Sequence, residues 1–210
     1  LIKNILSFTL LLPLLGSFLL LITPFQNKSV LKSIVLNFSC LTFISSLVLW
    51  IFFDKSIGTF QFTEKFLWIP ILNINFPLGV DGISLFFVIL TTLLIPLCLL
   101  ASWKSIDTDL KKYFMAFLIM EFFLIGVFCI LDLLLFYIFF ESVLIPMYLI
   151  VGVWGSRERK IRAAYFFFLY TLLGSVLMLL AILYIYYQVG TTDYEVLLSF
   201  IFSPTEQKII

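Results

Sequence analysis

Apolar residues fill this chain in six long runs, and short polar segments separate the runs. They cover residues 5–23, 31–53, 83–103, 113–131, 133–154 and 163–187. Each run approaches or exceeds the roughly 20 residues that a helix needs to cross a bilayer core. Because lipid offers no partner to a free backbone amide, the runs predict helices rather than open strands. The pattern indicates an all-α integral membrane protein in which residues 1–210 form a single membrane domain.

The longest polar segment, residues 54–82, lies between the second and third runs. Residues 59–63 alternate between polar and aromatic side chains, which is typical of a strand. The segment therefore predicts either a short β-hairpin on the membrane surface or an irregular loop. Asp81 and Ser84 follow it directly, and either side chain can cap the helix predicted from the third run.

Small residues inside two of the runs predict close contacts between helices. The first run contains Pro13, Gly16 and Ser17. One face of the sixth run carries Thr171, Gly174, Ser175 and Met178. Because small side chains let two helix backbones approach each other, we expect both faces to pack against a neighbour.

Composition supports the membrane assignment and excludes several functional classes. The chain is 63% hydrophobic and 12% charged, whereas soluble domains are about 25% charged. Its net charge of +1 gives no reason to expect a nucleic-acid partner. It contains no histidine, and its three cysteines match no metal or redox spacing. We therefore expect no cofactor and no metal in this chain.

Positive charge is concentrated in the segments that follow the first, third and fifth runs. These segments hold nine of the 13 basic residues, namely Lys28, Lys32, Lys104, Lys111, Lys112, Arg157, Arg159, Lys160 and Arg162. Basic loops stay on the inner side of a membrane, so this pattern predicts that both ends of the chain lie outside. The cluster at 157–162 is expected to anchor this topology, with binding of anionic lipids such as cardiolipin as a second role.

Glu141 is the carboxylate that the pattern singles out. It lies nine residues after Asp132 in the fifth run, or about 14 Å along a helix. A charged group at that depth is costly and usually functional. Pro146 cannot donate to the carbonyl of Ser142, which leaves that carbonyl free to hold water. The arrangement predicts a proton-transfer site, and the alternative is a structural carboxylate paired with another helix.

Other side chains could extend such a relay. Tyr137 and Tyr148 share the helix face of Glu141. Glu121, in the preceding run, is also expected near mid-membrane, on one face with Asp132 eleven residues later. Glu121 could serve as a relay or form an interhelical hydrogen bond, and Asp132 could carry protons or cap the fifth helix.

Three stretches resemble a known family: GVDGISLFFVILTTLLIPL (Gly79–Leu97), LDLLLFYIFFESVLIPMYLIVGVWGSRERKIRAAYFFFLYTLLGS (Leu131–Ser175) and GTTD (Gly190–Asp193). They are similar to the chain 4 family in the membrane arm of respiratory complex I, the NADH:ubiquinone oxidoreductase. That family is related to subunits of Mrp-type cation/proton antiporters. The resemblance covers essentially the whole chain.

The resemblance implies a proton-pumping subunit of an H⁺-translocating NADH:ubiquinone reductase. Glu141 matches the family's proton-transfer glutamate on the fifth helix, and Asp132 matches a carboxylate at the start of that helix. FMN, iron–sulfur clusters and ubiquinone are then held by other subunits of the complex. The implied location is the mitochondrial inner membrane, and a bacterial plasma membrane is the alternative.

The family is more than twice as long as this chain, and its seventh helix carries a lysine that acts on the glutamate. We therefore expect either a partial chain or a subunit whose C-terminal half is a separate chain, in addition to other membrane-arm partners. Two other functions stay open: a subunit of a stand-alone cation/proton antiporter, and a structural membrane scaffold.

Overall fold

The computed structural model describes residues 4–23, 28–69, 74–106, 108–203 and 207. Its helices and strands are α1 (Ile5–Ile22), α2 (Lys28–Phe52), β1 (Gln61–Ile69), β2 (Ile74–Val80), α3 (Gly82–Ala101), α4 (Leu110–Cys129), α5 (Leu133–Trp154), α6 (Lys160–Val189) and α7 (Tyr194–Ser199). By length and composition α1 to α6 can each cross a membrane, so the prediction of six spanning helices is confirmed.

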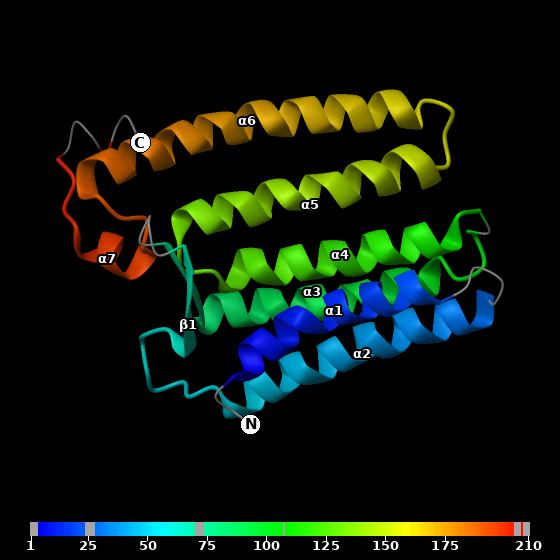
Figure 1. Cartoon of the computed structure of the whole chain (residues 1–210), viewed down its shortest axis with the longest axis horizontal. Helices are drawn as coiled ribbons and strands as arrows, with labels where there is room; N and C mark the ends of the chain where they lie inside the picture. The colour runs from blue at the N-terminus through cyan, green and yellow to red at the C-terminus, as the bar shows by residue number, and fades with distance from the viewer. Residues whose placement is uncertain (1–3, 24–27, 70–73, 107, 204–206, 208–210) are drawn as a thin grey trace.

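Helices α1 to α4 pack into a bundle, and α5 and α6 are added to one side of it (Figure 1). The main contact of α5 inside the bundle is α4, and the main contact of α6 is α5. The connections that follow α1, α3 and α5 lie at the same end (Figure 1). This end carries the basic segments, and we call it the inner end; the other is the outer end.

The first helix is held at both ends by charged side chains from distant parts of the sequence. The buried Glu64 of β1 accepts hydrogen bonds from the backbone amides of Leu6 (3.2 Å) and Ser7 (3.4 Å), and from the Ser7 hydroxyl. At the other end the Lys111 ammonium donates to the carbonyls of Leu21 (2.8 Å) and Thr23 (3.0 Å). An anion at the N-terminus and a cation at the C-terminus both match the helix dipole.

Two apolar clusters fill the interior of the bundle, one near each end. The outer cluster includes Leu10, Leu49, Val88 and Ile125, one from each of α1 to α4. The inner cluster takes Leu20, Val35, Ile95 and Leu118 from the same four helices. Buried polar residues occupy the depth between the two clusters, where burial requires hydrogen-bond partners.

The polar segment between α2 and α3 forms the β-hairpin that the alternation predicted, with β1 antiparallel to β2. The predicted cap of α3 is also confirmed. The side chain of Asp81 accepts from the Ser84 amide at 2.7 Å, and the Ser84 hydroxyl accepts from the Asp81 amide at 2.9 Å. The hairpin lies at the outer end, where its edge reaches the link between α4 and α5.

The expectation of close packing holds for α1 and fails at Gly174. A Cβ atom added at Gly16 would lie 2.8 Å from the ring of Phe38 and 3.1 Å from Leu118, so α2 and α4 both approach α1 there. A Cβ atom at Gly174 would meet nothing within 4 Å. On α6 the buried positions are instead Ala164, Ser175 and Ile182, because α6 has only α5 as its main neighbour.

Candidate functional site

Asp132 fixes the start of α5 with both of its carboxylate oxygens. Oδ1 accepts from the backbone amides of Leu134 (2.9 Å) and Leu135 (3.0 Å), which makes Asp132 the N-cap that was predicted. Oδ2 accepts from the hydroxyl of Thr192 at 2.5 Å. The side chain is 5% exposed. Three donors occupy both oxygens of this carboxylate, which favours a structural role.

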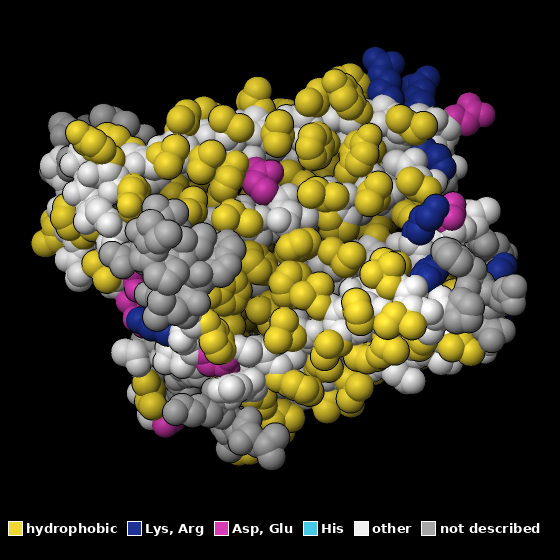
Figure 2. All heavy atoms as spheres, in the orientation of Figure 1, with side chains coloured by type: hydrophobic (Ala, Val, Ile, Leu, Met, Phe, Trp, Pro, Cys, Tyr) yellow, Lys and Arg dark blue, Asp and Glu magenta, His cyan; other side chains and the backbone are white. Residues whose placement is uncertain are grey.

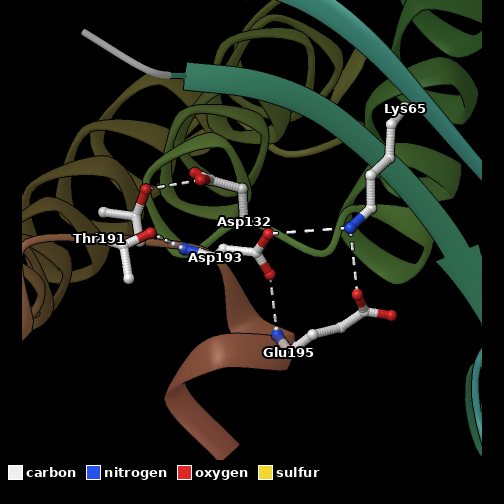
Figure 3. A network of polar contacts seen from close by, with 6 residues as sticks. Lys65, Asp132, Thr191, Asp193 and Glu195 are labelled. Carbon is white, nitrogen blue, oxygen red and sulfur yellow. Dashed lines mark hydrogen bonds and ion pairs between the residues drawn. The ribbon is translucent and has the colours of Figure 1, made fainter.

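The segment that follows α6 closes over this cap (Figure 3). Thr192 accepts at its carbonyl from the Leu133 amide, at 2.9 Å. Beside it, Asp193 caps α7 and lies 4.0 Å from the Lys65 ammonium, which also pairs with Glu195 at 3.1 Å (Figure 3). These groups are half-exposed, so the ion pairs add little stability, and their main effect is to join the hairpin to α7.

Glu141 lies eight residues into α5, about 12 Å below its first residue. Its side chain is half-buried. The oxygen Oε1 is buried and has no hydrogen-bond partner in the described part of the chain. A buried carboxylate oxygen without a donor is costly, and in membrane proteins such groups mark ion or proton paths.

Helix α5 carries Tyr137 and Tyr148, the two tyrosines proposed from the sequence as relay residues. Tyr137 lies beside Glu141 and beside Ser175 of α6. Ser175 is itself buried, with its hydroxyl donating to the carbonyl of Leu172 at 2.9 Å. Tyr148 packs its ring edge-on against Phe168 of α6, with 5.7 Å between the ring centroids. Glu141 therefore has a hydroxyl-bearing neighbour on the α6 side, and Tyr148 lies closer to the inner end.

Glu121 lies in the interior of the bundle and is fully buried. Neither of its carboxylate oxygens has a hydrogen-bond partner among the described residues. The predicted shared face with Asp132 is wrong, because α4 ends at Cys129 and the backbone turns to an extended conformation at Ile130. Asp132 therefore caps α5, whereas Glu121 faces the bundle.

Hydrophobic side chains cover the face of the protein seen over α4, α5 and α6, and most Lys and Arg side chains gather at the inner end (Figure 2). On α6 a stripe of large side chains is exposed, at Tyr170, Leu173, Leu177 and Leu180. Such a surface is suited to lipid or to further helices. Within the residues that the structure describes, no group of three or more Asp, Glu, Cys or His could hold a metal ion.

Sequence reasoning misses Thr192, because 60 residues separate it from the carboxylate that it contacts. It also misses the charged residues that hold α1, Glu64 and Lys111. The only local signal is the polar GTTD stretch that directly follows α6.

Comparison with known proteins supports the resemblance that the sequence carries. Residues 130–209 match the family model described as NADH:quinone oxidoreductase/Mrp antiporter, TM. NADH-ubiquinone oxidoreductase chain 4 of Chondrus crispus is 59% identical over 97% of this chain, and that of Arabidopsis thaliana is 60% identical over 96%. The chain is a homologue of NADH-ubiquinone oxidoreductase chain 4. It spans 42% and 41% of the length of these two relatives.

Solved structures agree with this assignment. A chain of respiratory complex I from Thermus thermophilus with bound NADH superposes with a TM-score of 0.79 over 97% of this chain, at 29% identity. This chain covers 40% of that one. A chain of the archaeal membrane-bound sulfane sulfur reductase gives a TM-score of 0.73 at 20% identity, which shows a shared fold. These matches show that the chain has a multi-pass membrane fold of the antiporter-like type.

Proposed function

We propose that this chain is part of a membrane-arm subunit of NADH:ubiquinone oxidoreductase that takes part in proton translocation coupled to quinone reduction. It acts with other membrane-arm subunits in the mitochondrial inner membrane, since the similar chain 4 proteins include those of plants and algae. FMN, iron–sulfur clusters and ubiquinone belong to other subunits of the complex. The basic inner end binds anionic lipid headgroups such as those of cardiolipin.

Glu141 is the proton-transfer carboxylate in this proposal. The observation that carries it is the buried oxygen Oε1, which has no donor among the described residues although Glu141 lies deep within a spanning helix. A cation that approaches Glu141 favours its ionised form, and withdrawal of that cation favours proton uptake. Tyr137 lies beside both Glu141 and Ser175 of α6, so its hydroxyl can pass a proton to or from the carboxylate.

The test is the substitution Glu141→Gln in the assembled complex. Gln keeps the size of the side chain and cannot be ionised, so we expect NADH-driven proton translocation to fall by roughly 10²-fold or more. Assembly should be unchanged, because Oε1 makes no hydrogen bond to the described residues that the substitution would break. The matched control is Glu158→Gln at the exposed inner end, which should translocate protons normally.

Each alternative function has its own outcome in this experiment. Normal translocation in Glu141→Gln would refute the role of this carboxylate. Loss of assembly, with normal translocation by the residual complex, would indicate a structural scaffold. Transport that depends on sodium and needs no NADH would indicate a stand-alone antiporter, which the family model also covers.

A further inference from the structure

A layer of buried polar side chains crosses the α1–α4 bundle at mid-depth. In each of these helices the apolar positions of the outer cluster give way to polar ones before the inner cluster begins. We call this the mid-depth layer, and its members are Ser17, Ser39, Thr42, Ser45, Ser46, Thr91, Thr92 and Glu121. Small Ser and Thr side chains let helices pack closely in lipid, but a buried carboxylate such as Glu121 is not needed for that packing.

The hydroxyl groups of the layer donate their hydrogens to backbone carbonyls of their own helices, except where Ser46 or Thr92 donates to the other. Thr42 donates to the carbonyl of Phe38 at 2.7 Å, and Ser17 donates to that of Leu14 at 2.8 Å. The Ser46 and Thr92 hydroxyls also lie 2.8 Å apart and link α2 to α3. Because the hydrogens are occupied, the hydroxyl oxygens face the interior mainly as acceptors. The layer can therefore receive a hydrogen bond from a protonated acid or from water, but offers few donors to an anion.

Glu121 is the one carboxylate of the layer. It lies between Leu118 of the inner cluster and Ile125 of the outer cluster, on the same face of α4. Leu118 approaches α1 at Gly16, so this face of the helix points into the bundle. Glu121 is fully buried there, and neither oxygen has a partner among the described residues. Within the described part of the chain Glu121 therefore forms no interhelical hydrogen bond, which was the structural alternative.

The neighbouring helices bring no positive charge to the layer. The spanning residues of α1 and α3 include no Asp, Glu, Lys or Arg. Helix α2 carries Lys28 and Lys32, but only in its first two turns at the inner end. Lys111 is ten residues before Glu121, about 15 Å along α4, and it binds carbonyls at the end of α1. From α5 the titratable residues are Tyr137, Glu141 and Tyr148, none of which is a cation.

We propose that Glu121 is a proton-binding site of this chain, separate from Glu141. Its carboxylic acid lies between two apolar clusters and exchanges its proton with water that enters the mid-depth layer. On release the carboxyl O–H bond breaks, the proton passes to a water molecule, and the electron pair stays on the carboxylate. On uptake the same bond forms again. The site deepens the proposed function because it adds a second place where the subunit stores a proton, but its existence does not depend on translocation.

The experiment is infrared difference spectroscopy of the assembled complex at neutral pH. The spectrum of the wild type minus that of Glu121→Gln should show the carbonyl stretch of one protonated carboxylic acid. In D₂O the same band should move to lower frequency, as the acid proton is replaced by deuterium. Absence of the band would show that Glu121 is ionised and would overturn the proposal. A band that stays unshifted in D₂O would overturn the exchange with water.

Variants of the layer separate this site from a merely buried acid. Thr92→Val removes a hydroxyl from the layer and should slow the deuterium shift several-fold while the band itself remains. Thr171→Val removes a hydroxyl that makes the same kind of bond to its own helix on α6, outside the layer, and should leave the rate unchanged. Equal rates in both variants would contradict the role of the layer. Because Glu141→Gln should leave the Glu121 band in place, failure of the proposed function and failure of this inference give different results.

Discussion

Replacement of Asp132 by Ala or Asn tests whether this carboxylate carries protons or holds α5 in place. The geometry favours the second role, since three donors occupy its two oxygens. Asp132→Ala removes the N-cap, which costs about 1 kcal/mol. It also leaves the buried Thr192 hydroxyl without its charged acceptor, which costs about 1.5–3 kcal/mol. We therefore expect a total loss of about 3 kcal/mol in the free energy of unfolding.

Asp132→Asn should cost only about 1 kcal/mol, because its side-chain carbonyl can still accept from the amides of Leu134 and Leu135. The measurement is equilibrium unfolding in mixed micelles, followed by tryptophan fluorescence. A double-mutant cycle of Asp132→Ala with Thr192→Val should give a coupling energy of about 1–2 kcal/mol. Proton translocation per assembled complex should stay normal in Asp132→Asn. A variant as stable as the wild type that no longer translocates protons would refute the structural role.

Two other perturbations follow from local geometry. Gly126→Ala should destabilise the protein by about 1–3 kcal/mol, because the new Cβ would lie 2.2 Å from the buried ring of Phe139. The second substitution Phe139→Val should restore part of the lost stability. Gly174→Ala is the control, because a Cβ atom there meets nothing within 4 Å. The Ser56 hydroxyl and backbone amide hold the pKa of Asp54 below its usual value, so Ser56→Ala should raise that pKa in an NMR titration. The contact stabilises the folded state above the unfolded pKa of Asp54, and this stabilisation is lost as pH falls through the folded pKa. An unchanged Asp54 pKa in Ser56→Ala would contradict the role of the contact.

The sequence predicts those parts of this fold that depend on lipid or on local contacts. The six spans follow from hydropathy, since only a helix satisfies its own backbone in hydrocarbon. The Asp81 and Asp132 caps are also local, because each carboxylate binds amides two or three residues ahead. The hairpin was one of two alternatives, because a strand pattern of five residues is too short to decide.

The contacts that the sequence could not predict join residues far apart in the chain. The pairing of Thr192 with Asp132 depends on where α6 ends relative to α5. The mid-depth layer becomes visible only when four helices are aligned in depth, since a single Thr or Ser in a spanning helix is unremarkable. Gly174 was expected to pack, because helical spacing identifies a face but not which face has a neighbour.

The two charged clamps on α1 have a consequence for biogenesis. This helix leaves the ribosome before Glu64 and Lys111, which bind its ends. Until α4 has begun to emerge, α1 can cross the membrane without a fixed position, since its own first and last turns carry no charged residue. Helix α1 is thus docked at both ends only after α4 has begun to emerge, so its docking depends on a residue made 90 positions after Leu21.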